Sequence, residues 1–147
     1  MMKRVKQWVH AEEKDLAEMI AYWAPKIGVA DWLIEAVVVN PDDMSSTYVD
    51  GRVIWYTTRR MAQIMVCNPD VISRNIAHDT EMILVHEMLH VAFCHASDQL
   101  VEANVTKTEE AVMIEQPIDQ IAQTLVLLRR NAGGKSKHRF SFEKGKK

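Results

Sequence analysis

The chain is poor in the residues that mark disulfide-rich, fibrous and membrane-spanning proteins. Its 147 residues include two cysteines, five glycines and four prolines. Cys67 and Cys94 lie in no redox or metal-binding motif, so reduced thiols and a cytoplasmic location are expected. No apolar run approaches the roughly 20 residues that a membrane span requires. The basic N-terminus is followed by charged residues rather than by the apolar segment of a secretion signal.

The charge of the chain is unevenly distributed. Residues 133–147 contain six Lys or Arg and one Glu, a net charge of +5, so the rest of the chain carries −7 of the total of −2. An acidic body argues against a nucleic-acid-binding surface, and only weak contact with nucleic acid through the basic tail is expected. The length predicts one domain, residues 1–132, followed by a basic, disordered tail over residues 133–147.

One five-residue segment, His86-Glu87-Met88-Leu89-His90, matches the pattern H-E-x-x-H. Residues four apart lie on one face of a helix, so both imidazoles can reach a single metal ion. Glu87 lies one position around the helix, where its carboxylate can polarise a metal-bound water without acting as a ligand. The surrounding apolar residues predict a buried helix from about Thr80 to Ala96. The alternative is two core histidines and a glutamate that are satisfied by hydrogen bonds without a metal.

The remaining periodicities predict an α+β fold, with a small, mostly antiparallel sheet of three to four strands beside this helix. The Asp50-Gly51 pair is a strong signal for a two-residue hairpin turn. The other elements expected are an amphipathic helix over residues 4–24 ended by Pro25 and Gly28, a strand over 32–39, a hairpin that pairs 47–49 with 52–56, a strand over 61–67, a polar loop over 97–107 and a last helix over 108–130.

A catalytic zinc ion takes three protein ligands and keeps one position open. After the two motif histidines, the candidates for the third ligand are His95, Glu102, Glu109, Glu110 and Glu115. On a continuous helix His95 would point about 180° away from His86 and lie on the order of 13 Å further along the axis. We therefore expect His95 to have a structural role or to lie outside the ligand set.

The apolar stripe of the last helix ranks the glutamates. Measured around the helix axis, Glu110 lies about 50° from the centre of this stripe, Glu115 about 90° and Glu109 about 150°. Glu110 is the favoured third ligand, with Glu109, Glu115 and His95 as alternates. The competing interpretation is a solvated, acidic first turn that complements the helix dipole. Pro117 could instead begin a shorter helix, which would make the register before it unreliable. The predicted stripe consists of Ala111, Ile114, Ile118, Ile121, Leu125 and Leu128.

The chain resembles the minimal zincin metallopeptidases of the gluzincin type. The resemblance rests on the H-E-x-x-H segment, on the later Glu109-Glu110-Ala111, and on the order of helix, small sheet, metal helix and ligand helix. More narrowly, the chain is similar to compact zincin-like proteins carried by phages and prophages, which are related in pattern to the ImmA/IrrE and SprT-like groups. In those proteins a Gly-x-x-x-Trp segment leads from the first helix into the first strand, and Gly28 and Trp32 match it. His95 matches the histidine that often closes the ImmA-type motif.

The resemblance implies hydrolysis of peptide bonds with one zinc ion (Zn²⁺) per chain, in the cytoplasm of a cell or of a phage's host. His86, His90 and Glu110 would be the zinc ligands, and Glu87 would act as general base and proton shuttle for a zinc-activated water. The expected partner is a protein or peptide substrate, held along the sheet edge as an added strand.

Two points stay open at this stage. The donor that stabilises the oxyanion could be Tyr48, Tyr56 or His95. The alternatives to a peptidase are a non-catalytic, zinc-binding regulatory protein and a phage accessory protein that holds no metal.

Overall fold

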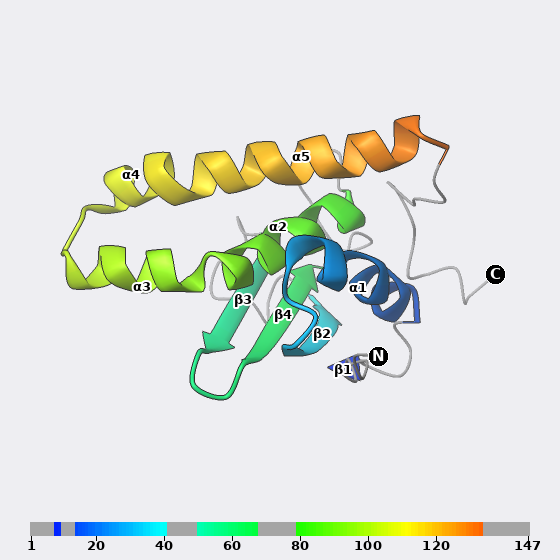
Figure 1. The fold of residues 1–147 in the computed structure, drawn as a ribbon, viewed down its shortest axis with the longest axis horizontal. Helices are drawn as coiled ribbons and strands as arrows, with labels where there is room; N and C mark the ends of the chain where they lie inside the picture. Colours follow the sequence, from blue (N-terminus) through cyan, green and yellow to red (C-terminus); the bar gives the residue numbers. More distant parts are fainter. Residues whose placement is uncertain (1–7, 10–13, 41–49, 68–78, 134–147) are drawn as a thin grey trace.

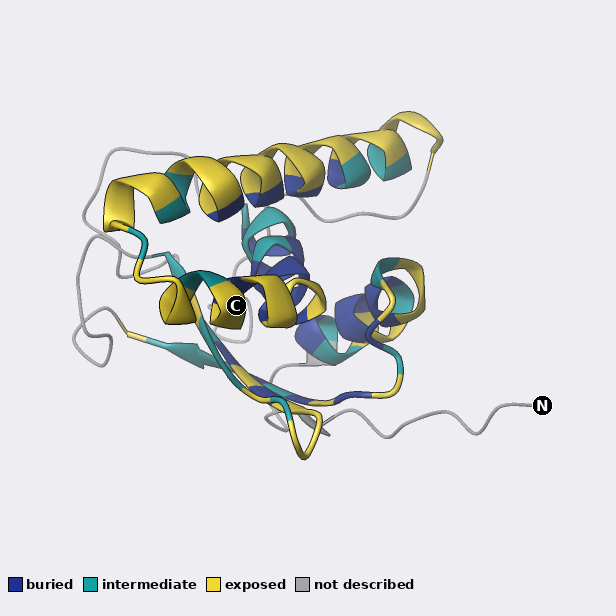
Figure 2. Ribbon diagram, turned by 60° about the vertical axis from the view of Figure 1, so that its left-hand side comes forward, coloured by how far each residue is buried: buried dark blue, intermediate teal, exposed yellow. Residues whose placement is uncertain are grey.

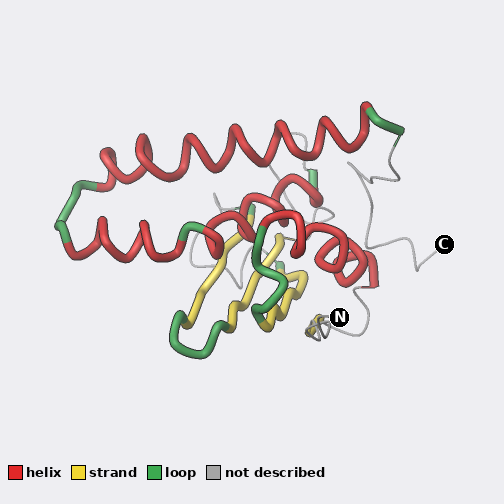
Figure 3. Tube along the Cα trace, in the orientation of Figure 1, coloured by secondary structure: helices red, strands yellow, loops and turns green. Residues whose placement is uncertain are grey.

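The computed structural model of the chain describes residues 8–9, 14–40, 50–67 and 79–133. These residues confirm the expected α+β class, with the helices gathered over one face of a small sheet (Figures 1 and 3). The elements are β1 (Trp8–Val9), α1 (Lys14–Ile27), β2 (Leu33–Val39), β3 (Gly51–Tyr56), β4 (Met61–Cys67), α2 (Thr80–Ala92), α3 (Cys94–Glu102), α4 (Lys107–Glu110), the π-helical segment η3 (Ala111–Glu115) and α5 (Gln116–Asn131).

The sheet is mixed, with the strand order β1-β2-β4-β3. β1 and β4 both run parallel to β2, and only β3 runs antiparallel to its neighbour β4. The expectation of a mostly antiparallel sheet is therefore wrong for two of the three pairings, because the periodicity of a strand does not reveal its neighbour. β3 lies at one end of this order, so one of its edges is not paired with another described strand.

The hairpin found in the described residues joins β3 to β4. Gly51 begins β3 and pairs with Val66, while residues 57–60 make the tight turn into β4. Arg60 adopts a left-handed conformation at φ 52° in this turn. The expected strand over residues 47–49 lies outside the described residues.

The first helix also begins later than predicted. Trp8–Val9 form a short strand beside β2, and α1 starts only at Lys14. α1 continues through Pro25 to Ile27, and Gly28 ends it with φ 95°, a conformation that glycine adopts without strain.

α2 is a buried helix, as predicted, because helices or strands surround it. The carboxylate of Asp79 caps it by accepting a hydrogen bond from the Met82 amide at 3.1 Å. Figure 2 shows the buried surfaces of the helices facing inward onto the sheet. The core side chains include Leu16, Ile20 and Trp23 of α1, Ile34, Ile64 and Val66 of the sheet, and Leu84, Val85 and Met88 of α2.

The chain bends at Phe93 (φ −100°, ψ 18°), between α2 and α3. α3 then extends to Glu102, so the polar segment from residue 97 is largely helical rather than the expected loop. Its hydrophilic side chains occupy the exposed face of the helix, and Cys94 and Ser97 occupy the buried face.

The last helical stretch contains a π-helical insertion. In η3 the amide of Gln116 bonds to the carbonyl of Ala111, five residues back. Pro117 follows directly and has no amide hydrogen for an α-helical bond to Met113. The insertion rotates the helix that follows, so the buried stripe differs from the predicted one: Ile121 and Leu128 are 36% and 60% exposed, and the buried residues are Ile114, Ile118, Ala122 and Val126. None of the helices in the described ranges is both long and apolar enough to cross a bilayer.

Candidate metal centre

Three side chains from two elements converge at the centre of the molecule. Nε2 of His86 lies 3.1 Å from Oε1 of Glu115, and Nε2 of His90 lies 3.0 Å from Oε2 of the same carboxylate. Each residue offers one potential ligand atom, and these atoms all lie within 4.8 Å of one another. The two imidazole side chains are 19% and 11% exposed, while that of Glu115 is 50% exposed. The geometry leaves one side of the cluster open to solvent.

The arrangement follows from an antiparallel pairing of α2 with η3 and α5. Contacts join Glu81 to Arg129, His86 to Asp119 and His90 to Glu115. Residues later in α2 thus contact residues earlier in the facing helix, as expected when two helices run in opposite directions. On α2 the two histidines are one turn apart, with ring centroids separated by 5.0 Å. A single carboxylate on the facing helix can therefore reach both rings.

The structure brings Glu115, an alternate in the sequence ranking, into the cluster with the two histidines in place of the favoured Glu110. The ranking assumed 100° per residue throughout the helix, but the π-helical turn from Ala111 to Glu115 breaks this regular progression. Glu110 lines the same cleft but does not join the cluster. Pro117 was the available sequence signal, because it made the register upstream of it unreliable.

The other alternates lie away from the two histidines. Glu109 forms a capping box with Thr106, accepting from its amide at 2.7 Å and donating its own amide to the hydroxyl at 3.1 Å. Its carboxylate thus has the helix-terminal role that the competing interpretation assigned to it. His95 is exposed on α3 and belongs to no cluster of metal-ligating groups among the described residues.

Neither of the two described candidates for the oxyanion donor lies at the cluster. Tyr56 is 51% exposed and lies outside the residues that line the central cleft. Tyr48 lies outside the described residues. His95 does not line the cleft either.

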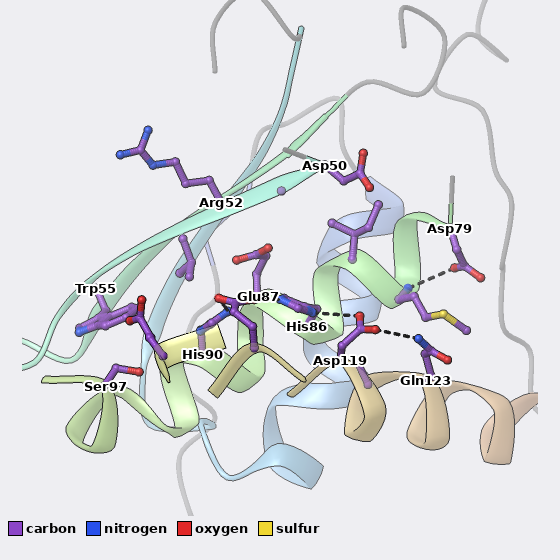
Figure 4. A pocket seen from close by; sticks show the side chains of 17 residues that line it. Asp50, Arg52, Trp55, Asp79, His86, Glu87, His90, Ser97, Asp119 and Gln123 are labelled. Atoms are coloured by element: carbon purple, nitrogen blue, oxygen red, sulfur yellow. Dashed lines mark hydrogen bonds and ion pairs between the residues drawn. The ribbon is translucent and has the colours of Figure 1, made fainter. Parts of the chain in front are cut away.

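Glu87 lies beside the cluster and is 7% exposed. Its carboxylate makes no hydrogen bond or ion pair with any residue in the described ranges, although it lines the cleft (Figure 4). Burial raises the pKa of Glu87 to about 7, against the opposing effect of the two motif histidines. A buried carboxylate without a partner is costly, so this side chain is suited to a proton-accepting role rather than to a structural one.

Gly51 allows β3 to approach Glu87 closely. A Cβ atom at Gly51 would lie 3.0 Å from Oε2 of Glu87 and 2.6 Å from Cγ2 of Ile83. Any larger residue at this position would force the glutamate or the strand to move.

Asp119 and Trp55 are two further neighbours that the sequence prediction missed. Oδ1 of Asp119 lies 3.4 Å from Nδ1 of His86, the ring nitrogen that faces away from Glu115, and Figure 4 marks this contact. A carboxylate in this position fixes the orientation and tautomer of an imidazole. The indole of Trp55 lies nearly parallel to the His90 ring, at 14° and 6.5 Å between centroids. The spacing of Asp119, one α-helical turn after Glu115, was the signal available in the sequence.

The charges of the cluster are strongly coupled. Burial lowers the pKa of His86, but the hydrogen bond with Glu115 and the nearby carboxylates outweigh it and raise the pKa above its ordinary value of 6.5. Hydrogen bonds from His86 and His90 hold the pKa of the Glu115 carboxyl far below its usual range. The cluster therefore keeps its carboxylate ionised and favours the protonated form of His86.

A second group of contacts holds the same helices together at their other ends. Glu81 is fully buried and accepts hydrogen bonds from Trp23 at 2.8 Å, from Arg129 at 2.8 Å and from Arg130 at 3.3 Å. Arg130 also donates twice to Asp79, at 2.8 and 3.0 Å. The hydrogen bond from Trp23 joins α1 to α2, and the ion pairs join α2 to α5 and fix how the two helices lie against each other.

The cluster opens into a cleft of about 800 Å³. β3 forms one wall, α2 the floor, and η3 with α5 the opposite wall (Figure 4). The residues that line the cleft extend from Asp79 at the start of α2 to Ser97 on α3.

Comparisons of the chain with protein-family models, with curated proteins and with solved structures found no match.

Proposed function

We propose that the protein is a zinc-dependent metallopeptidase, with His86, His90 and Glu115 as the zinc ligands and Glu87 as the general base. The observation that supports it most is the convergence of these three ligand atoms within 4.8 Å, beside a buried carboxylate that has no hydrogen-bond or ion-pair partner among the described residues. Two histidines and one carboxylate with an open side are a donor set typical of catalytic zinc.

The donor set also fits zinc in its chemistry. Neutral imidazole nitrogens and a carboxylate oxygen are ligands of zinc, and Asp119 at Nδ1 of His86 supplies the outer carboxylate that zinc-bound histidines commonly have. Bound zinc would supply Lewis acidity and lower the pKa of water towards 7. Glu115 bridges both imidazoles in the structure, so zinc would replace these hydrogen bonds with ligand bonds.

Glu87 would take the proton of the attacking water at a carboxylate oxygen and then deliver it to the leaving amine. Its position next to the histidines and inside the cleft suits both transfers. The pKa of about 7 matches the carboxylate to proton transfer near neutral pH.

An extended peptide would bind along β3. Among the described strands β3 has a free edge, and residues 50–53 of the chain line the cleft beside the cluster. Main-chain hydrogen bonds to this edge would hold the peptide across the histidines without regard to its sequence. The α5 wall would then contact its side chains.

The proposal is tested by measuring zinc and peptide cleavage together. Wild-type protein purified without a histidine tag should hold about one zinc per chain and should cleave casein or a mixed peptide library. Glu87→Gln should keep the zinc and lose cleavage, since only the proton acceptor is removed. Glu115→Gln should lose both. Zinc far below one per chain in the wild type would rule out the proposal.

The bridging position of Glu115 favours one further candidate, a metal-free protein whose motif histidines are held by ion pairs. In the structure one carboxylate contacts both imidazoles, at 3.1 and 3.0 Å. This candidate predicts no zinc uptake and no change in thermal stability when zinc is added. A regulatory protein with structural zinc would instead show zinc uptake, while Glu87→Gln would leave its function intact.

A further inference from the structure

We infer that the cleft contains a subsite for a positively charged substrate side chain, formed by Trp55, Ser97 and Glu110 at the His90 end of the metal cluster. The inference rests on the proposed peptidase function and specifies its substrate class: peptides with a lysine or arginine at a position on one side of the cleaved bond. The three residues come from β3, α3 and the last residue of α4, and all three line the cleft.

The helical geometry places Glu110 at this end of the cleft. Glu110 precedes Glu115 by five residues, which is one turn of the π-helical segment between them. Asp119 follows Glu115 by one α-helical turn. The three carboxylates therefore form a column along the cleft-facing side of this helix, and all three line the cleft.

Of these three carboxylates, Glu110 is the one that is not engaged with the histidines. Glu115 contacts both imidazoles, and Asp119 contacts His86 and accepts a hydrogen bond from Gln123 at 2.9 Å. Glu110 is half-buried and makes no side-chain hydrogen bond or ion pair within the part of the chain that the structure describes. Because α2 and the last helix run antiparallel, Glu110 lies beyond His90, opposite the start of α3.

Ser97 provides an independent sign of a ligand at the same place. It is 4% exposed, yet its hydroxyl has no side-chain hydrogen-bond partner among the described residues. Figure 4 shows Ser97 beside Trp55, with its hydroxyl oriented toward the His90 side. Among the described residues the fully buried side-chain polar atom without a partner is Oγ1 of Thr80, so the Ser97 hydroxyl is reachable from the cleft and can bond there to water or to a ligand.

Trp55 completes the subsite with an aromatic surface. Its ring is nearly parallel to that of His90, and its Nε1 donates to Asp98 at 3.4 Å, which fixes the indole. The faces of an indole attract ammonium and guanidinium groups. An aromatic face, a hydroxyl that can accept a hydrogen bond and a carboxylate together match a lysine or arginine side chain rather than an acidic or purely apolar one.

Arg52, the one Lys or Arg among the described residues that line the cleft, does not oppose this charge preference. Arg52 lies on β3 between Gly51 and Val53, and alternation along a strand sends its side chain to the face opposite Val53 and Trp55. Figure 4 shows the guanidinium extending away from the histidines. At the other end of the cleft, Asp79 is neutralised by Arg130, so the uncompensated negative charge is concentrated near Glu110.

The test uses the full chain loaded with zinc and a set of matched peptides. Each peptide is alanine-rich and carries lysine, norleucine or glutamate at one position, scanned across both sides of the cleaved bond. We expect kcat/KM to be about tenfold higher for lysine than for glutamate, at positions on one side of the bond only. Glu110→Gln should reduce this ratio to near one, and Glu110→Lys should invert it. Glu18→Gln, which removes one exposed charge from α1, serves as the matched control and should keep the ratio.

Binding separates the failure of the inference from the failure of the proposed function. Labelled lysine and glutamate peptides are titrated into zinc-loaded Glu87→Gln protein, and fluorescence anisotropy reports binding without cleavage. Cleavage by the wild type with no lysine preference at any position overturns the subsite and leaves the peptidase proposal standing. Lysine-selective binding that depends on Glu110, with no cleavage of any peptide by the wild type, supports the subsite and overturns the peptidase proposal.

Discussion

The carboxylate of Glu115 lies 3.1 Å from Nε2 of His86, although 29 positions separate the two residues in the sequence. The contact depends on the π-helical turn that directly precedes Pro117, since this turn brings Glu115 to the cleft-facing side of the helix. π-helical insertions occur frequently at functional sites, and here the insertion sets which glutamate meets the histidines.

Replacing Glu115 tests this assignment against the residue that the sequence favoured. Glu115→Gln should weaken zinc binding by at least 100-fold, because it removes an anionic ligand while preserving size. Glu110→Gln makes the same chemical change about one turn away and should leave zinc affinity within a factor of three of the wild type. Competition with a chromophoric chelator measures both dissociation constants. The reverse order of effects would restore Glu110 as the ligand.

Asp119 should act on zinc through His86. Asp119→Asn keeps the shape but removes the charge that orients Nδ1 of the imidazole, so zinc affinity should fall by about 10- to 100-fold. Gln123→Ala, which removes the other hydrogen-bond partner of Asp119, is the control and should have a smaller effect. Equal effects of the two substitutions would show that Asp119 acts only by packing.

The buried carboxylate of Glu81 should stabilise the fold more than any exposed acid. Glu81→Gln leaves the cations of Arg129 and Arg130 without the charge that they contact at 2.8 and 3.3 Å, and should lower the free energy of unfolding by about 3 kcal/mol. Urea denaturation of the metal-free protein measures this change. Glu18→Gln, at an exposed position on α1, should change this free energy by less than about 0.5 kcal/mol. A loss of similar size in both variants would contradict the role given to the ion pairs.

Gly51 should be required for the position of Glu87. In Gly51→Ala the new Cβ would lie 3.0 Å from Oε2 of Glu87 and 2.6 Å from Cγ2 of Ile83, so one of these groups must move. We expect kcat to fall about tenfold or more while zinc content stays at one per chain, because the ligands lie on other residues. Gly51→Ala combined with Ile83→Val relieves the shorter contact and should recover part of the loss. Unchanged kcat in the single variant would show that β3 adapts without disturbing Glu87.

The sequence was most informative where local pattern determines structure. The burial of α2, the spacing of His86 and His90 on one face and the strands over residues 33–39 and 61–67 all follow from short-range periodicity. The H-E-x-x-H segment led directly to three of the residues at the centre of the cleft.

The fold predicted from the sequence was wrong where contacts between distant parts of the chain determine the local structure. The two residues of β1 form a strand only because β2 lies beside them, and the β2–β4 pairing depends on chain segments far apart in the sequence. The π-helical turn contains one residue more than an α-helical turn. An ideal helical wheel, which assumes 100° per residue throughout, therefore assigns the wrong direction to the side chains on one side of it. The bend at Phe93 has neither glycine nor proline to mark it.

The pH dependence of zinc binding and that of the metal-free fold should have opposite signs. Without metal, the pKa of His86 is raised above 6.5 by its carboxylate neighbours, so its contribution to stability is complete below pH 6.5 and disappears as the pH rises through the raised value. The pKa of Glu87, raised from 4.5 to about 7, acts in the same direction. The unfolded chain ionises first, so this contribution to stability is complete below pH 4.5 and is lost as the pH rises to about 7. The pKa of Glu115 is lowered, so its contribution is present above pH 4.5 and is lost only in stronger acid.

The metal-free protein should therefore have a higher Tm at pH 5.5 than at pH 8. Zinc binds neutral imidazole, so protons compete with it and its affinity should rise over the same interval. Hence the gain in Tm on adding zinc should be largest at pH 8 and should shrink towards pH 5.5. Differential scanning calorimetry with and without zinc across this range measures both trends. His86→Gln should flatten the response of the metal-free protein, whereas His95→Gln, which changes an exposed histidine outside the cluster, should not. A metal-free protein whose Tm rises steadily from pH 5.5 to pH 8 would contradict the charge coupling described for the cluster.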